Sequence, residues 1–259
     1  MTLIKHELKQ GRNTLLIWSV AISLLLGICI MMFPEIKNTN VNDLFSSMGD
    51  FTAALGMDQV NFGTLIGFYV VECGMILNLG GAFFAALTAI AALSKEEKEH
   101  TAEFLLTHPV SRVRVITEKL MAVLLQILVM NVVIFGLALV AILISGEEIP
   151  WKELALVHTA SLLMQIEVAG FCFGISAFLR GGSLGIGLGI AIILFFLSII
   201  ANMSEMAEFL KYITPFSYAE GADIVANGAL DVGKILLGMG YTLVGIGAAY
   251  WKYCKKDIH

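Results

Sequence analysis

Long apolar stretches separated by short polar connections are the dominant pattern of this sequence. At about 1.5 Å of rise per helical residue, each stretch is long enough to cross the roughly 30 Å hydrocarbon core of a bilayer. The pattern therefore predicts an all-α integral membrane protein with six transmembrane helices. The whole chain, 1–259, is expected to form a single transmembrane domain, with spans at about 14–33, 62–93, 120–144, 154–179, 184–201 and 235–251.

An amphipathic stretch precedes the first apolar run. Its apolar side on a helical wheel comprises Ile4, Leu8, Gly11 and Leu15. Its polar and mostly basic side comprises Lys5, His6, Lys9, Arg12 and Asn13. Glu7 does not fit the basic side. The pattern favours an N-terminal helix that lies in the membrane interface, with a frayed basic terminus as the alternative.

The composition excludes a soluble protein and agrees with the predicted number of spans. Hydrophobic residues make up 58% of the chain, the mean hydropathy is +0.85, and charged residues make up only 14%. A soluble domain needs charge spread over its surface, whereas these charges gather between apolar runs. The sequence has no basic patch that would indicate a nucleic-acid partner, and most side chains are expected to be surrounded by membrane lipid.

The positions of Lys and Arg predict the orientation. Of the 16 basic residues, all but four fall in the N-terminal stretch, the connection between the second and third spans, Arg180 and the C-terminal tail. The four exceptions are Lys37, Lys152, Lys211 and Lys234. The positive-inside rule then places both termini in the cytoplasm of a multi-pass protein of the cell membrane.

The connection at 202–234, on the predicted outer side, carries its own helical pattern. Met206, Phe209, Leu210 and Ile213 recur at helical spacing, and a second segment around 218–225 follows Pro215. A helical outer segment between the fifth and sixth spans is therefore expected. It is either a hairpin that dips toward the membrane under a cover of protein, or a surface loop with two interfacial helices.

The cytoplasmic connection at 94–119 also has helix signals. Ser94 with Glu97 three residues later fits a capping box, and Pro109 is a helix stop. The pattern predicts a short charged helix that crosses the cytoplasmic surface.

Motifs for enzymatic chemistry are missing from the sequence. The stretch 228–235 resembles the start of a phosphate-binding loop, but Ile235 stands where a metal-binding hydroxyl is needed. His6-Glu7 lacks the second histidine of a zinc-protease helix, and no two cysteines have metal-ligand spacing. We therefore expect no cofactor, no metal site and no catalytic residues in this chain.

Two glutamates lie inside apolar runs, namely Glu72 and Glu167. An ionisable group at membrane depth costs about 3 kcal/mol or more, so each is a candidate for the transport path. The alternative is a structural role beside amides that link helices, such as Asn78, Gln126, Asn131 and Gln165. Glycines at four-residue spacing favour close helix packing, as in the pairs Gly63 and Gly67, Gly170 and Gly174, and the series Gly181, Gly185 and Gly189.

The stretch 96–112, EEKEHTAEFLLTHPVSR, resembles the cytoplasmic connection of permease subunits in the type-2 family of ABC transporters. The matching positions are Thr101, Glu103, Leu105, Leu106, Pro109, Val110, Ser111 and Arg112. His100 replaces a usual glycine, and Thr107 replaces a usual serine. The order of the predicted elements agrees with the same family.

The resemblance implies a transmembrane permease subunit of an ATP-driven exporter. The connection would act as a coupling helix that docks in a groove of a separate ATP-binding subunit through Thr101, Glu103, Leu105, Leu106, Pro109 and Arg112. A second permease subunit, identical or different, would complete the translocation path. Members of the family mostly export drugs, peptides, lipids or ions, and the sequence leaves the substrate open.

Two other functions remain as alternatives from the sequence. An ion-coupled secondary transporter could use Glu72 or Glu167, but it predicts broken helices in two corresponding halves, which the sequence does not show. An intramembrane enzyme needs a metal or nucleophile constellation at membrane depth, and His158 is the only histidine in a predicted span.

Overall fold

The structure, a computed structural model, describes residues 2–37, 60–98, 111–179, 184–203 and 205–255. Every regular element within these ranges is helical, and six helical segments are long and apolar enough to cross a membrane. The predicted all-α membrane fold is confirmed. The segments are α1 (Thr2–Lys37), the consecutive α4 (Leu65–Phe68), η2 (Tyr69–Cys73) and α5 (Gly74–Lys98), α7 (Arg112–Ser145), α8 (Trp151–Ser176), α9 (Leu184–Met203) and α11 (Val232–Lys255).

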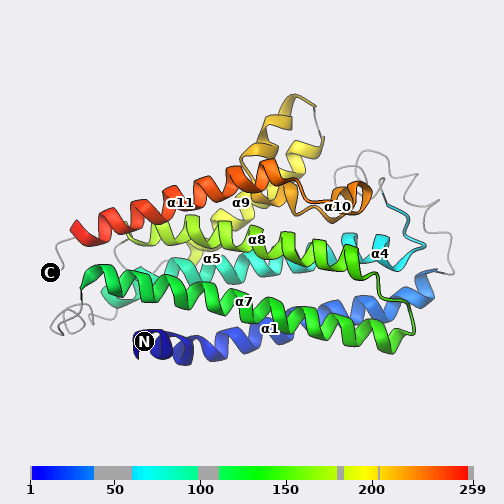
Figure 1. The fold of residues 1–259 in the computed structure, drawn as a ribbon, viewed down its shortest axis with the longest axis horizontal. Helices are drawn as coiled ribbons and strands as arrows, with labels where there is room; N and C mark the ends of the chain where they lie inside the picture. Colours follow the sequence, from blue (N-terminus) through cyan, green and yellow to red (C-terminus); the bar gives the residue numbers. More distant parts are fainter. Residues whose placement is uncertain (1, 38–59, 99–110, 180–183, 204, 256–259) are drawn as a thin grey trace.

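The long helices lie side by side along one axis, and both ends of the chain are at the same end of the bundle (Figure 1). α1 packs mainly on α7, α5 packs on α8 and α9, and α8 packs on α11. In their most apolar windows α5 and α8 bury 56% and 61% of their residues, whereas α11 buries 11%. The pair formed by α5 and α8 is therefore the centre of the fold.

The predicted interfacial stretch and the first span form one continuous helix, α1, of 36 residues. A helix of this length spans about 54 Å, so its first turns project beyond a hydrocarbon core of about 30 Å. Lys5 and Lys9 are exposed there, as the helical wheel predicts. Glu7 faces α7 instead, where its Oε1 accepts a hydrogen bond from Lys119 Nζ at 2.8 Å. The lysine is only 2% exposed, so this ion pair fixes the first turns of the two helices together.

The second span contains an irregular turn. Thr64 caps its start, since its hydroxyl accepts a hydrogen bond from the Gly67 amide. Between α4 and α5 the five residues of η2 form a π-helical turn, which widens the helix where Glu72 lies. π-Helical turns are rare in proteins, and those that occur are often found at functional sites.

The helix predicted to begin at Ser94 does not begin there. Ser94 lies inside α5, which continues to Lys98, and its hydroxyl donates to the Ile90 carbonyl at 2.7 Å. A serine in a helix interior can satisfy itself this way, so the capping pattern was misleading. The rest of the predicted coupling helix, at 99–110, lies outside the described residues. α7 then begins at Arg112, about two turns before the predicted third span, with Ser111 as its N-cap.

The sequence predicts that four intramembrane amides can link helices, and three of them do so among the described residues. Asn131 of α7 donates to Gln165 of α8 at 2.7 Å, and Gln165 donates back at 3.5 Å. Asn78 of α5 accepts a hydrogen bond from Ser161 of α8 at 2.6 Å. Gln126 differs, because it donates to the Ala122 carbonyl of its own helix.

Glycines bring α8 and α11 into backbone contact. A Cβ on Gly174 would lie 2.7 Å from the Gly245 carbonyl oxygen, and a Cβ on Gly245 would lie 3.0 Å from the Gly170 carbonyl oxygen. The predicted role of the Gly170 and Gly174 pair is therefore confirmed. Gly185 and Gly189 have no atom in range of an added Cβ in the described structure, so they do not pack on another helix of this chain.

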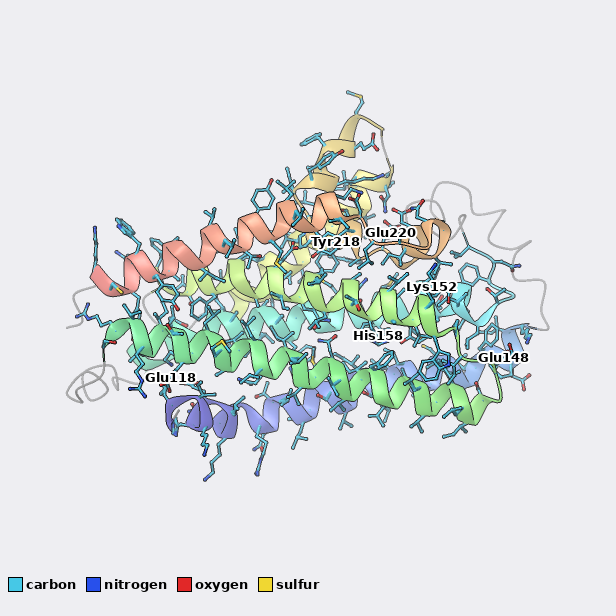
Figure 2. The ribbon with its side chains drawn as sticks, in the orientation of Figure 1. Glu118, Glu148, Lys152, His158, Tyr218 and Glu220 are labelled. Carbon is cyan, nitrogen blue, oxygen red and sulfur yellow. The ribbon has the colours of Figure 1, made fainter. Side chains whose placement is uncertain are left out.

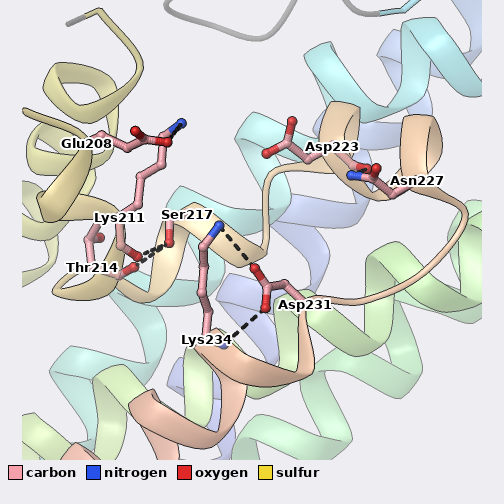
Figure 3. Close-up of polar contacts among 8 residues, drawn as sticks. All are labelled: Glu208, Lys211, Thr214, Ser217, Asp223, Asn227, Asp231 and Lys234. Carbon is pink, nitrogen blue, oxygen red and sulfur yellow. Dashed lines mark hydrogen bonds and ion pairs between the residues drawn. The ribbon is translucent and has the colours of Figure 1, made fainter. Parts of the chain in front are cut away.

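The outer segment divides into an exposed and a buried half. Its first helix, η3 (Glu205–Tyr212), exposes Met206 and Phe209. The next, η4 (Pro215–Tyr218), is entirely buried, and Thr214 ahead of it donates to the Leu194 carbonyl in the middle of α9. α10 (Gly221–Asn227) follows, and Figure 3 shows these short helices with the Asp231–Lys234 ion pair at the start of α11. The buried half favours the predicted hairpin that dips under a cover of protein.

The contact between α8 and α11 leaves no room for a side chain. We expect Gly174→Ala to destabilise the bundle by about 1–3 kcal/mol, because the added methyl group must push two backbones apart. Gly136→Ala on α7 is the matched control, since nothing lies within 4 Å of its added Cβ. Thermal unfolding of both purified variants followed by circular dichroism measures the difference. An equal midpoint for the two variants would contradict this account of the crossing.

Candidate functional site

Most of the predicted docking residues lie outside the described residues, namely Thr101, Glu103, Leu105, Leu106 and Pro109. Arg112 is described and is the first residue of α7. Its Nη1 donates a hydrogen bond to the Cys254 carbonyl of α11 at 3.2 Å. The predicted docking connection therefore enters α7 directly beside the last turn of the C-terminal helix.

A second contact ties the same two helices one to two turns deeper. The Thr117 hydroxyl of α7 and the Tyr250 hydroxyl of α11 lie 2.7 Å apart. We name this pair of contacts, Arg112–Cys254 and Thr117–Tyr250, the inner clamp. Both contacts hold the last turns of α11 against α7.

Glu167 lies just past the middle of α8 and is only 4% exposed. The Tyr218 hydroxyl of η4 donates to its Oε1 at 2.6 Å. Its other oxygen lies against Gly238 of α11, where an added Cβ would come within 1.9 Å of it. One carboxylate thus joins α8, α11 and the buried half of the outer segment. Figure 2 shows Tyr218 between α8 and α11.

An apolar cleft of about 460 Å³ runs along the boundary between α8 and α11. Glu167 and Thr242 are among the residues that line it, and Ile213 and Pro215 of the outer segment line it too. Phe171 and Tyr241 in its wall are 45% and 47% exposed, so the cleft opens to the side of the bundle. The cleft has the size of sites that bind small molecules.

The other candidate glutamate, Glu72, is not among the residues that line this cleft. It lies in η2, is partly buried, and makes no hydrogen bond or ion pair with any residue that the structure describes. The structure therefore does not bring Glu72 and Glu167 into one site. The π-helical turn around Glu72 is the feature that sets it apart.

The sequence does not reveal the partners of two buried polar groups, His158 and Glu167. His158 of α8 is 7% exposed, and its Nε2 lies 2.7 Å from the Tyr69 hydroxyl of η2. The ring of Phe135 packs edge-on against the same histidine at 4.9 Å between centroids. Tyr69 and Tyr218 carried no sequence signal, because each appears as an ordinary aromatic residue until the fold brings it to a polar side chain.

Glu220 gives no sequence signal either, because it lies in the connection at 202–234 and only the fold places it directly after the buried helix η4. It lies beside a small cavity of about 80 Å³ and accepts a hydrogen bond from Asn202 Nδ2 at 2.8 Å. Burial raises the pKa of its carboxyl to about 7. This pKa already includes the opposing effect of the Asn202 hydrogen bond, a smaller rise from the charge of Asp223, and the lowering effects of the charges of Lys211 and Lys234.

No group of three or more potential metal ligands occurs among the described residues. The described cysteines are Cys29, Cys73, Cys172 and Cys254, and all are free thiols. The buried polar side chains named above join helices or line cavities, as polar groups at membrane depth commonly do.

Six apolar helices define this chain as a multi-pass helical membrane protein. The family model described as ABC-2 family transporter protein matches residues 1–258. The chain therefore belongs to the ABC-2 transporter family, as the sequence resemblance predicts, and is a permease of an ABC transporter. Permeases of this family are translocation components and are not themselves catalytic, and they generally work with ATP-binding subunits. No curated protein matches the chain.

The raised pKa of Glu220 predicts a pH-dependent stability. In the folded state its carboxyl retains a proton up to about pH 7, whereas in the unfolded state it loses the proton near the ordinary value of 4.5. The folded protein should therefore lose stability as the pH rises between these two values, by about 3 kcal/mol in total, and change little above them.

Glu220→Gln should remove this loss, because a neutral amide can still accept the hydrogen bond from Asn202. Unfolding midpoints of the variant and the parent, measured from pH 4.5 to pH 8, test this. Glu208→Gln is the control, since the side chain of Glu208 is 66% exposed. A Glu220→Gln variant with the same slope as the parent would show that this carboxyl does not carry the pH dependence.

Proposed function

We propose that the chain is the transmembrane permease subunit of an ATP-driven ABC exporter. A second permease half, identical or different, would complete the translocation path, and separate ATP-binding subunits would hydrolyse ATP. The substrate would be of drug, peptide, lipid or ion type. The family match over residues 1–258 is the observation that carries the proposal. Family membership favours this function over an ion-coupled secondary transporter.

We propose that both termini face the cytoplasm of the cell membrane and that 1–259 forms one transmembrane domain. The two termini lie at one end of the bundle (Figure 1), as an even number of spans requires. The same end carries Lys5, Lys9, Arg12, Arg112, Arg114, Lys252 and Lys255 among the described basic residues. The positive-inside rule supports a cytoplasmic location for this end.

The docking element would be the connection between α5 and α7. Both helices are long and uninterrupted, from Gly74 to Lys98 and from Arg112 to Ser145, so they would carry a displacement of the connection into the bundle as rigid bodies. The inner clamp would pass the motion to α11, and α11 forms one wall of the cleft that contains Glu167. Closure of the ATP-binding subunits would thus shift the population between cleft arrangements.

The proposed orientation can be tested with the thiol of Cys254, which is exposed near the C-terminus. In intact cells an impermeant maleimide should leave Cys254 unlabelled, and it should label Cys254 after permeabilisation. For the opposite face, Glu208→Cys in a Cys254→Ser background should be labelled in intact cells, because Glu208 lies on the exposed outer helix η3. Reversed labelling of the two positions would overturn the orientation.

The docking role predicts that charge at Leu105 and Leu106 releases the ATP-binding subunit. Burying a leucine in a partner groove contributes about 1.5–3 kcal/mol, so Leu105→Asp with Leu106→Asp should lower the co-purified subunit by about tenfold or more. ATP hydrolysis that depends on the permease should fall in parallel. The permease is co-expressed with its ATP-binding subunit for this measurement.

Met206→Asp with Phe209→Asp is the matched control for that double variant. It makes the same change in charge on the outer segment, where the two side chains are 91% and 62% exposed. The control should retain the ATP-binding subunit at the parental level. Retention by the Leu105 and Leu106 double variant as well would refute the docking role.

A further inference from the structure

We propose that the cleft between α8 and α11 is a binding site for amphipathic organic cations, with Glu167 as the group that pairs with the positive charge. This inference rests on the proposed export function and names its substrate class. The expected ligand has an apolar or aromatic body and an ammonium group that carries N–H donors.

The first support is the charge of the cleft. Among the described residues that line it, Glu167 is the only carboxylate, and there is no Lys, Arg or His. Its carboxylate accepts a side-chain hydrogen bond from the Tyr218 hydroxyl, which is a neutral donor. A carboxylate surrounded by apolar groups is stabilised far more by a cation than by a neutral hydroxyl group. The cleft is therefore complementary to a positive charge.

The second support is an unsatisfied hydroxyl group in the same cleft. Thr242 Oγ1 is buried and has no hydrogen-bond partner among the described residues, although a threonine in a helix commonly donates to its own backbone. Thr242 is one turn after Gly238, the residue that packs against the Glu167 carboxylate. The hydroxyl and the carboxylate therefore lie on facing helices at neighbouring levels. An ammonium group bound at this level of the cleft could donate to both.

The third support is the apolar wall and its opening. Val168, Phe171, Ile175, Leu194 and Val244 line the cleft together with the ring of Tyr241. The exposure of Phe171 and Tyr241 places the opening on the side of the bundle, where the bilayer surrounds the protein. An amphipathic ligand partitioned in the membrane could enter from that side with its body against the apolar wall.

Glu167 can serve as the charge partner because the fold supports it from behind. Tyr218 holds Oε1 and fixes the direction of the side chain, and the missing side chain at Gly238 leaves room for Oε2. A site held on rigid helices by a second layer of contacts binds with less loss of conformational freedom. The same arrangement has no counterpart at Glu72, which lies outside the cleft.

Dansylcadaverine is a suitable probe, because it joins an aromatic body to a primary ammonium group and its fluorescence reports binding. The full chain is titrated in nanodiscs of phosphatidylcholine, which carry no net charge. We expect saturable binding, displaced by n-decylammonium and not by n-decanol. Neutral dansylamide should bind at least about tenfold more weakly, because it lacks the charge that pairs with Glu167. Equal affinity for the two dansyl probes, or displacement by decanol, would overturn the inference.

Three variants locate the site. Glu167→Gln keeps the shape of the side chain and should weaken binding of dansylcadaverine by about tenfold or more. Thr242→Val should weaken it by about threefold, and Glu72→Gln is the control that should bind at the parental level. If Glu167→Gln fails to fold, the displacement experiment on the parent and the Thr242→Val titration decide the question. Parental affinity in a folded Glu167→Gln variant would show that the cation binds elsewhere.

The titration contains neither ATP nor an ATP-binding subunit, so its outcome is separate from that of the docking test. Absence of binding together with release of the ATP-binding subunit by the Leu105 and Leu106 variant would remove the substrate class and keep the exporter. Saturable binding of dansylcadaverine, together with a parent chain that co-purifies with no ATP-binding subunit, would keep the cation site and remove the exporter.

Discussion

The interior of a bilayer offers no hydrogen-bond partners, and this constraint decides how α8 is placed. α8 carries three polar side chains on one face, His158, Ser161 and Gln165, at a spacing of three and four residues. Each finds its partner on a different element, and the partners are Tyr69 of η2, Asn78 of α5 and Asn131 of α7. A shift of α8 would break all three contacts at once, so these bonds specify its position while apolar packing supplies most of the cohesion.

The opposite side of α8 is held differently. There Glu167, Gly170 and Gly174 face α11. Gly174 meets the backbone of Gly245, whereas the Thr242 side chain packs on Gly170 and the Glu167 carboxylate packs on Gly238. The carboxylate needs a donor at membrane depth, and this need explains why η4 is buried while the preceding helix η3 is exposed. The outer segment therefore dips because Tyr218 must reach Glu167, as well as because its apolar residues seek cover.

The spans were predictable because long apolar runs have few alternatives in a membrane, but their ends were not. α1 and α7 extend beyond the apolar runs that predict them. Lys119 of α7 is buried there by an ion pair with Glu7 and not by hydrophobicity. Hydropathy alone therefore places the starts of these helices too late and their ends too early. The cost of a carboxylate at membrane depth singles out Glu167 in the sequence. Its partner Tyr218, 51 residues away in sequence, was not predictable, because only the tertiary fold brings them together. The predicted helix start at Ser94 was wrong for a local reason, because a serine hydroxyl can donate to a carbonyl inside a helix as well as cap a helix start.

The unequal attachment of α8 bears on how a transport cycle could proceed. Toward η2, α5 and α7, α8 is fixed by buried hydrogen bonds whose loss would leave polar groups unsatisfied, at about 1–3 kcal/mol for each group. Toward α11 the contact passes through glycines, where Gly174 meets Gly245, Thr242 rests on Gly170 and Glu167 rests on Gly238. Meanwhile α11 is held to α7 by the inner clamp, next to the proposed docking connection. We infer that α11 pivots about this clamped end, while its first half, which contains Gly238 and Thr242, moves along α8. This movement would displace Thr242 and Gly238 relative to Glu167, the only carboxylate among the described residues that line the cleft, and so change the affinity of the cleft for a cation.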